Sequence, residues 1–304
     1  MRYIYGIIIL ILIIYILINK KNKIILIQNN KKKIYNFIIT NINNNSLNTN
    51  NRNLILLPHL ELGDNIIING IVRHYCTIYS NVILICKKNY QKQIEYMYSD
   101  LDNLLLYPIN GGIMEGIDIR DEFYYDYEMY NLFNQNNIDF IPMCGYRGAY
   151  SDYYVQNSEK YPEYFFEYLN VPYEIRYTKF KINRDNDAEN LLYNNLVNII
   201  GDKYIVIIDD EKRNYVIDKH INSASPIFKL GNNSNNKNTK LEIIKSDNIF
   251  NYIKILENAE EIHTIDSSIV LLIDALDLQV KTHIHRYIRP QAVKYKNTNF
   301  SYIM

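Results

Sequence analysis

The chain lacks an excess of either charge. Its 304 residues include 33 Lys and Arg against 33 Asp and Glu, so the formal net charge is zero. Affinity for nucleic acid comes largely from Lys and Arg that neutralise phosphates, and a neutral protein exerts no long-range attraction on a polyanion. We therefore expect no nucleic acid partner.

Cysteine, glycine and tryptophan are scarce. The sequence has three Cys, ten Gly and no Trp, but 30 Tyr, and it is rich in Ile, Asn and Lys, a bias typical of an AT-rich genome. Cys76, Cys86 and Cys144 are odd in number and widely spaced, which argues against a disulfide framework or a zinc site built on cysteine. We expect buried thiols in a reducing compartment.

Charge is also absent from residues 3–19, a run dominated by Ile and Leu, with Arg2 before it and Lys20, Lys21 and Lys23 after it. As a helix this run measures about 25 Å, slightly less than the roughly 30 Å hydrocarbon core of a bilayer, and flanking lysines can reach the headgroups. A strand of the folded body is the alternative, although seventeen residues exceed a usual strand. The run predicts a single-pass transmembrane helix.

Small residues needed for signal-peptide cleavage are missing, since no Ala precedes Ala149. Residues 1–30 are therefore predicted to be a retained membrane anchor with a basic flank, and residues 31–52 an Asn-rich linker. Basic residues are more numerous after the apolar run, so the positive-inside rule places the body on the cytosolic side.

Apolar runs alternate with helix-like patterns along the rest of the chain. This alternation is typical of βαβ units with parallel sheets, and a strand that is apolar throughout is buried on both faces. We predict an α/β fold with two Rossmann-like domains, at 53–182 and 183–304. Strands are expected at 53–57, 81–87, 104–108, 139–143, 204–208, 226–230, 241–244, 261–265 and 279–285, and helices at 64–80, 90–99, 248–258 and 268–276.

The first candidate site is the turn Leu62-Gly63-Asp64, which follows the first strand and opens a helix. Ligands of α/β sheets bind beyond the carboxyl ends of the strands, where Gly63 permits close approach and Asp64 offers a carboxylate. Asp64 as a simple helix cap is the alternative. Gly70 lets the same helix pack closely on the sheet or on a ligand.

The second candidate site is His263-Thr-Ile-Asp266-Ser267-Ser268, which precedes an apolar helix. Backbone amides at a helix N-terminus, together with the two hydroxyls, suit a diphosphate. A capping Asp or Ser beside a half-buried His is the alternative.

These two motifs, in this order and spacing over residues 53–290, resemble the glycosyltransferases of the heptosyltransferase type, glycosyltransferase family nine. The resemblance implies the GT-B architecture, in which two Rossmann-like domains face each other across a cleft. It also implies that Asp64 is the base that deprotonates the acceptor hydroxyl and that Asp266, Ser267 and Ser268 contact the donor's phosphates. The family's Asp-Ser-Gly-His is here Asp-Ser-Ser-Ile, with His263 upstream instead.

Around these positions we expect His59, Gly63 and Asn65 on the acceptor side and His263, Arg213 and Arg289 on the donor side. The partners would be a nucleotide-sugar, as substrate rather than cofactor, a glycan, lipid or protein acceptor, and the membrane through residues 3–19.

A metal ion is not expected. His283 and His285 share one face of a strand, but no third ligand is apparent, and the GT-B enzymes that the chain resembles generally need none. Arg286 and Arg289 in the same stretch suit phosphate instead. Two other functions stay open: a membrane-tethered α/β protein that binds a nucleotide or sugar without turnover, which the missing Gly and His favour, and a nucleotide-sugar epimerase.

Overall fold

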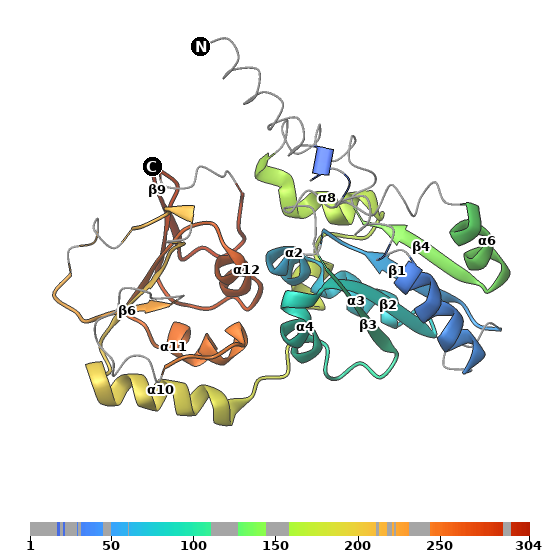
Figure 1. Cartoon of the computed structure of the whole chain (residues 1–304). Helices are drawn as coiled ribbons and strands as arrows, with labels where there is room; N and C mark the ends of the chain where they lie inside the picture. Colours follow the sequence, from blue (N-terminus) through green and yellow to red (C-terminus); the bar gives the residue numbers. More distant parts are fainter. Residues whose placement is uncertain are drawn as a thin grey trace, which may run out of the picture. The chain divides into compact units, whose positions relative to one another are not determined.

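The computed structural model describes residues 17–18, 21, 29, 32–44, 50–59, 61–110, 127–143, 158–210, 213–217, 221, 223–230, 244–287 and 293–304 (Figure 1). The predicted transmembrane helix at 3–19 lies outside these ranges except for residues 17–18, so it stays a prediction. In the ranges that are described, every helix is too short or too polar to cross a bilayer.

Contacts divide the described residues into two units. Unit 1 takes those in 1–61, 75–91 and 103–149, and unit 2 takes those in 62–74, 92–102 and 150–304. The helical segment that follows the first strand therefore belongs, by its contacts, to unit 2.

Unit 1 is built on a four-stranded parallel sheet, sheet A, with the order β3-β2-β1-β4. All five residues of β1 are buried, as its unbroken apolar sequence predicts for a central parallel strand. The order corresponds to 3-2-1-4 of the Rossmann fold, so the strand order reverses between β1 and β4. The strands are β1 (Asn53–Leu57), β2 (Asn81–Lys87), β3 (Leu104–Ile109) and β4 (Ile138–Pro142), each close to its predicted position.

Two helices contribute to the core of unit 1. One is α6 (Tyr127–Gln135), and the other covers residues 32–43, where the sequence predicts a linker. Ile34 and Ile38, one helical turn apart, are buried against sheet A, so this part of the predicted linker belongs to the folded body. Its Asn and Lys residues obscured the short apolar stripe. A 3₁₀ turn, η1 (Lys88–Tyr90), follows β2.

Unit 2 contains a five-stranded parallel sheet, sheet B, with the order β6-β5-β7-β8-β9. Numbered within the unit this is 2-1-3-4-5, the flavodoxin-like order, and the strand order reverses between β5 and β7. The last strand, β9, was not predicted, and of the predicted strand at 241–244 only Ile244 is described, as a bend. The strands are β5 (Ile205–Ile208), β6 (Ile227–Leu230), β7 (Glu261–Thr264), β8 (Thr282–His285) and β9 (Phe300–Ile303).

The helices of unit 2 include two departures from the sequence prediction. The helix expected at 64–80 is interrupted at Ile68, and α10 was not predicted although Asp185 caps it by accepting a hydrogen bond from the Ala188 amide. The α-helices are α2 (Leu62–Ile67), α3 (Asn69–Cys76), α4 (Gln91–Met97), α8 (Tyr161–Tyr168), α9 (Ile175–Thr178), α10 (Asn186–Ile200), α11 (Ile253–Glu257) and α12 (Ser268–Ala275), and the 3₁₀ turns are η3 (Ser158–Lys160) and η7 (Ile249–Tyr252); α3 and α4 extend into unit 1 at one end.

Candidate functional site

Asp64 lies in the first turn of α2 with only 8% of its surface exposed. The Tyr161 hydroxyl, at the start of α8, donates a short hydrogen bond to Oδ1 of Asp64. A carboxylate has two oxygens and about four acceptor positions, so this bond leaves capacity for another donor. Asp64 is therefore an oriented, largely buried carboxylate rather than an exposed helix cap.

Helix α2 lies against α12 within unit 2 (Figure 1). A Cβ atom added to Gly63 would be 3.0 Å from Cδ1 of Leu271 and 3.8 Å from Cα of Ser268. The absence of a side chain at Gly63 thus lets the backbone before Asp64 approach the first residue of α12. The two motifs, distant in sequence, are neighbours.

Asp266 lies where β7 ends, beside the end of β5, because the Ile265 amide donates to the Ile208 carbonyl. This is the position at which the strand order of sheet B reverses, the usual ligand position of such sheets. The Asp266 side chain is buried and its Oδ1 accepts a 2.5 Å hydrogen bond from the Tyr295 hydroxyl. Burial and the Asp266 carboxylate raise the pKa of Tyr295 well above its ordinary value, so Tyr295 stays a neutral donor.

A guanidinium also faces Asp266. Nε of Arg286 is 3.9 Å from Oδ2 of Asp266, and the cation lies 3.8 Å from the centre of the Tyr302 ring. The Arg286 side chain is 15% exposed, which retains access for an anion in a partly desolvated setting. Guanidinium groups of this kind bind phosphate with two parallel hydrogen bonds.

Ser267 occupies the N-cap position of α12, but its side chain makes no capping hydrogen bond. Its Oγ is buried and has no hydrogen-bond partner among the described residues. A buried hydroxyl without a partner costs roughly 1–3 kcal/mol, and Ser in this position ordinarily caps the helix. The hydroxyl and the first-turn amides of α12 together are suited to an anionic oxygen.

A pocket of about 370 Å³ opens within unit 2 next to these residues. It is bordered by three tyrosines, two carboxylates and two lysines, a lining with aromatic faces and charged hydrogen-bonding groups of both signs. Tyr295 connects the pocket to Asp266. The lining residues are Glu163, Tyr173, Glu174, Tyr177, Thr178, Lys294, Tyr295 and Lys296.

Asp274, near the end of α12, fixes one wall of the pocket. Its Oδ2 accepts hydrogen bonds from Arg176 (2.9 Å) and Tyr177 (3.0 Å), and its Oδ1 accepts from the backbone amides of Lys296 (2.8 Å) and Asn297 (2.9 Å). The Arg176 and Asp274 side chains are both fully buried. This carboxylate therefore holds α9 and the segment 295–297 against α12.

The remaining predicted site residues are not all near this pocket. Asn65 is buried in α2, next to Asp64, whereas His59 is buried in unit 1. Arg213 forms an ion pair with Asp210 of its own loop, with Nε 2.6 Å from Oδ2, and Arg289 lies outside the described residues.

His263 is placed within β7 rather than in the loop. Its Nε2 is 3.3 Å from Oε1 of Glu261 and its Nδ1 is 2.9 Å from Nε2 of His285. The structure thus brings His263 together with residues of β7 and β8, including His283, and not with the Ser267 hydroxyl through any of these contacts.

Sequence reasoning missed Tyr161 and Tyr295, which hold the two candidate carboxylates. Thirty tyrosines give no means of selecting these two, and neither is near its partner in sequence. Asp274 was also missed, because its partner Arg176 is 98 residues away.

Comparison with known proteins adds little to this geometry. No protein family model matches the chain, and no curated protein matches it in sequence. A solved structure, that of the E. coli heptosyltransferase WaaC with ADP-2-deoxy-2-fluoro heptose, aligns with 83% of this chain and 92% of that chain at 8% identity, with a TM-score of 0.38. At this identity and TM-score, the function has to be argued from the site alone.

Proposed function

We propose that the chain is a glycosyltransferase that moves a sugar from a nucleotide-sugar donor to an acceptor hydroxyl. The observation that carries the proposal is the closeness of the Gly63-Asp64 turn to the Ser267-Ser268 turn within unit 2, with 3.8 Å between a Cβ at Gly63 and Cα of Ser268. Sugar transfer needs a base and a stabilised diphosphate leaving group a few ångströms apart, and these turns offer one each.

Asp64 would accept the proton of the acceptor hydroxyl as the acceptor oxygen bonds to the anomeric carbon. The bond from that carbon to the donor's diphosphate breaks, and its electron pair leaves with the diphosphate. The Tyr161 hydrogen bond to Oδ1 supports this role because it fixes the carboxylate and favours its ionised form.

The leaving diphosphate would be stabilised by the Ser267 hydroxyl, the first amides of α12 and the guanidinium of Arg286. Arg286 replaces Arg213 in this role, since Arg213 is paired with Asp210, whereas Nε of Arg286 is 3.9 Å from Asp266. The tyrosine-lined pocket beside Asp266 would receive the donor's nucleoside or sugar.

The test is transfer measured over a panel of nucleotide-sugars and acceptors with the full chain. We expect Asp64→Asn to lower kcat about 10²–10⁴-fold, the usual contribution of a general base, with donor KM nearly unchanged. Ser267→Ala should instead raise the KM for the donor. The matched control is Asp277→Asn, an exposed residue with φ of 50°, a conformation that Asn adopts readily.

Transfer by Asp64→Asn at the rate of the Asp277→Asn control would eliminate Asp64 as the base. Binding of a nucleotide by wild type without any transferred product would favour a non-catalytic binding protein, for which Ser268 and Ile269 in place of the family's Gly and His are the supporting observation. A changed sugar in the absence of acceptor would indicate an epimerase.

A further inference from the structure

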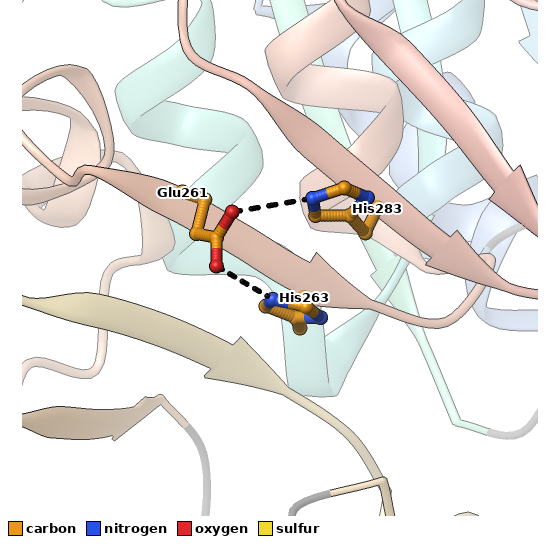
Figure 2. Close-up of side chains that lie close together, drawn as sticks. All are labelled: Glu261, His263 and His283. Carbon is orange, nitrogen blue, oxygen red and sulfur yellow. Dashed lines mark hydrogen bonds and ion pairs between the residues drawn. The ribbon is translucent and has the colours of Figure 1, made fainter. Parts of the chain in front are cut away.

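Three side chains on adjacent strands of sheet B converge outside the proposed transfer site. Glu261 and His263 lie two residues apart on β7, and His283 on β8 is in register with His263, so all three project from the same face of the sheet (Figure 2). Oε1 of Glu261 is 3.3 Å from Nε2 of His263, and Oε2 is 3.3 Å from Nε2 of His283.

These separations are long for hydrogen bonds to a carboxylate, which are about 2.7–2.9 Å when charge-assisted. They match the distance between ligand atoms around a tetrahedral Zn²⁺ ion, since bonds of about 2.0–2.1 Å give ligand separations of about 3.3–3.4 Å. The three candidate ligand atoms all lie within 4.8 Å of one another. Glu261 is 25% exposed and His283 17% exposed, so an ion can enter from solvent.

The second ring nitrogen of each imidazole is also held. Nδ1 of His283 is 2.6 Å from Oγ of Ser301, and Nδ1 of His263 is 2.9 Å from Nε2 of His285, whose Nδ1 in turn is 3.1 Å from the Tyr287 hydroxyl. Histidines that ligate metals nearly always donate their other N–H to such a partner, which fixes the ring and the tautomer. Burial lowers the pKa of His263, and the neutral imidazole is the ligating form.

We propose that Glu261, His263 and His283 bind a Zn²⁺ ion that links β7 to β8. The site has two imidazoles and a carboxylate, a ligand set found in zinc proteins, and it leaves one coordination position for water. It differs from the sequence expectation of no metal because Glu261 supplies the third ligand that His283 and His285 alone lack. The proposal does not depend on glycosyl transfer.

Binding would reverse the tautomers of the histidine relay. Without metal, His263 and His283 donate Nε2–H to Glu261, so Nδ1 of His263 accepts from Nε2–H of His285. With the ion on Nε2, His263 must donate Nδ1–H to His285, and His285 must carry its own proton on Nδ1. This switch of His285 is a readout that a hydrogen-bond network without metal would not produce.

Lys281 competes with the ion, because its Nζ lies 2.9 Å from Oε2 of Glu261. The Lys281 side chain is 63% exposed and can swing into solvent. Lys281→Met should therefore tighten Zn²⁺ binding, whereas a mere ion-pair cluster would gain no metal affinity from losing its lysine.

The experiment is calorimetric titration of the tag-free full chain with Zn²⁺, followed by imidazole ¹⁵N NMR. We expect one ion per chain, a switch of the His285 tautomer, and a loss of affinity of about 100-fold or more in His283→Gln and Glu261→Gln. Ser301→Ala, which removes only the second-sphere partner, should cost about 10–100-fold. His74→Asn, altering a histidine that contacts Lys179 instead, is the matched control.

Circular dichroism checks that each variant is folded, and Glu261→Gln keeps the shape and hydrogen-bonding capacity of the side chain if the histidine variants fail. Equal Zn²⁺ affinity in wild type and Glu261→Gln, or an equal loss in His74→Asn, would overturn the proposal. So would saturation with Zn²⁺ that leaves the His285 tautomer unchanged.

Discussion

Replacing Asp274 by Asn should destabilise unit 2 more than any change at an exposed ion pair. The Asp274 carboxylate receives four hydrogen bonds, two on each oxygen, and compensates the fully buried guanidinium of Arg176. An Asn amide keeps the size, but it removes the charge and turns an NH₂ group toward donors in either orientation.

Breaking a buried ion pair from one side costs about 3–5 kcal/mol, because the remaining charge is left uncompensated. Taking about 4 kcal/mol, and about 2–4 °C of Tm per kcal/mol for a unit of this size, we expect Asp274→Asn to lower Tm by roughly 10 °C. Arg176→Met should cost less, since the carboxylate would keep its bonds from Tyr177 and the two amides.

The assay is urea and thermal unfolding followed by far-UV circular dichroism, because the chain has no Trp to report by fluorescence. Asp210→Asn is the matched control, the same substitution in the more exposed pair with Arg213, and it should cost no more than about 1 kcal/mol. If Asp274→Asn unfolds at the same urea concentration as Asp210→Asn, the buried pair is not the anchor inferred here.

Two other expectations concern stability. Gly70→Ala should destabilise by about 1–3 kcal/mol in urea unfolding, because its Cβ would lie 2.1 Å from the backbone carbonyl of Ile175, whereas Gly63→Ala should cost less because it meets the flexible end of a side chain at 3.0 Å; equal costs would contradict the packing. The hydrogen bond from Arg73 lowers the pKa of Asp100 to about 2, from 3.8, so this carboxylate stabilises the fold above pH 4 and loses about 2 kcal/mol as pH falls toward 2. Asp100→Asn should flatten the dependence of unfolding free energy on pH over that range, and an unchanged slope would refute it.

Much of the fold was predictable because unbroken apolar runs of four to seven residues have few structural uses. Such runs as Asn53–Leu57 and Asn81–Lys87 became buried parallel strands at the predicted positions. The predictions failed where the signal was weaker: at 32–43, where Ile34 and Ile38 are embedded in polar residues, and at β9, a partly exposed edge strand.

The candidate site was predictable only in its chain-local part. Gly63, Asp64 and Ser267 stand out because each occupies the junction of a strand pattern and a helix pattern, which physics reserves for ligands in α/β sheets. Their partners Tyr161 and Tyr295 depend on tertiary contacts that no local pattern encodes. The Zn²⁺ ligands fall between: the strand period aligns Glu261 with His263, but only the pairing of β7 with β8 adds His283.

The segment 295–297 braces both ends of α12. Tyr295 donates to Asp266, just before the helix, while the amides of Lys296 and Asn297 donate to Asp274 near its end. Eight helical residues span about 12 Å, so the segment lies along the helix and couples the presumed phosphate site to the buried ion pair. Tyr295→Phe should then weaken donor binding with little loss of stability, whereas Asp274→Asn should reduce both. Measured by nucleotide-sugar calorimetry beside urea unfolding, unaltered donor affinity in a folded Asp274→Asn protein would show that the two ends act independently.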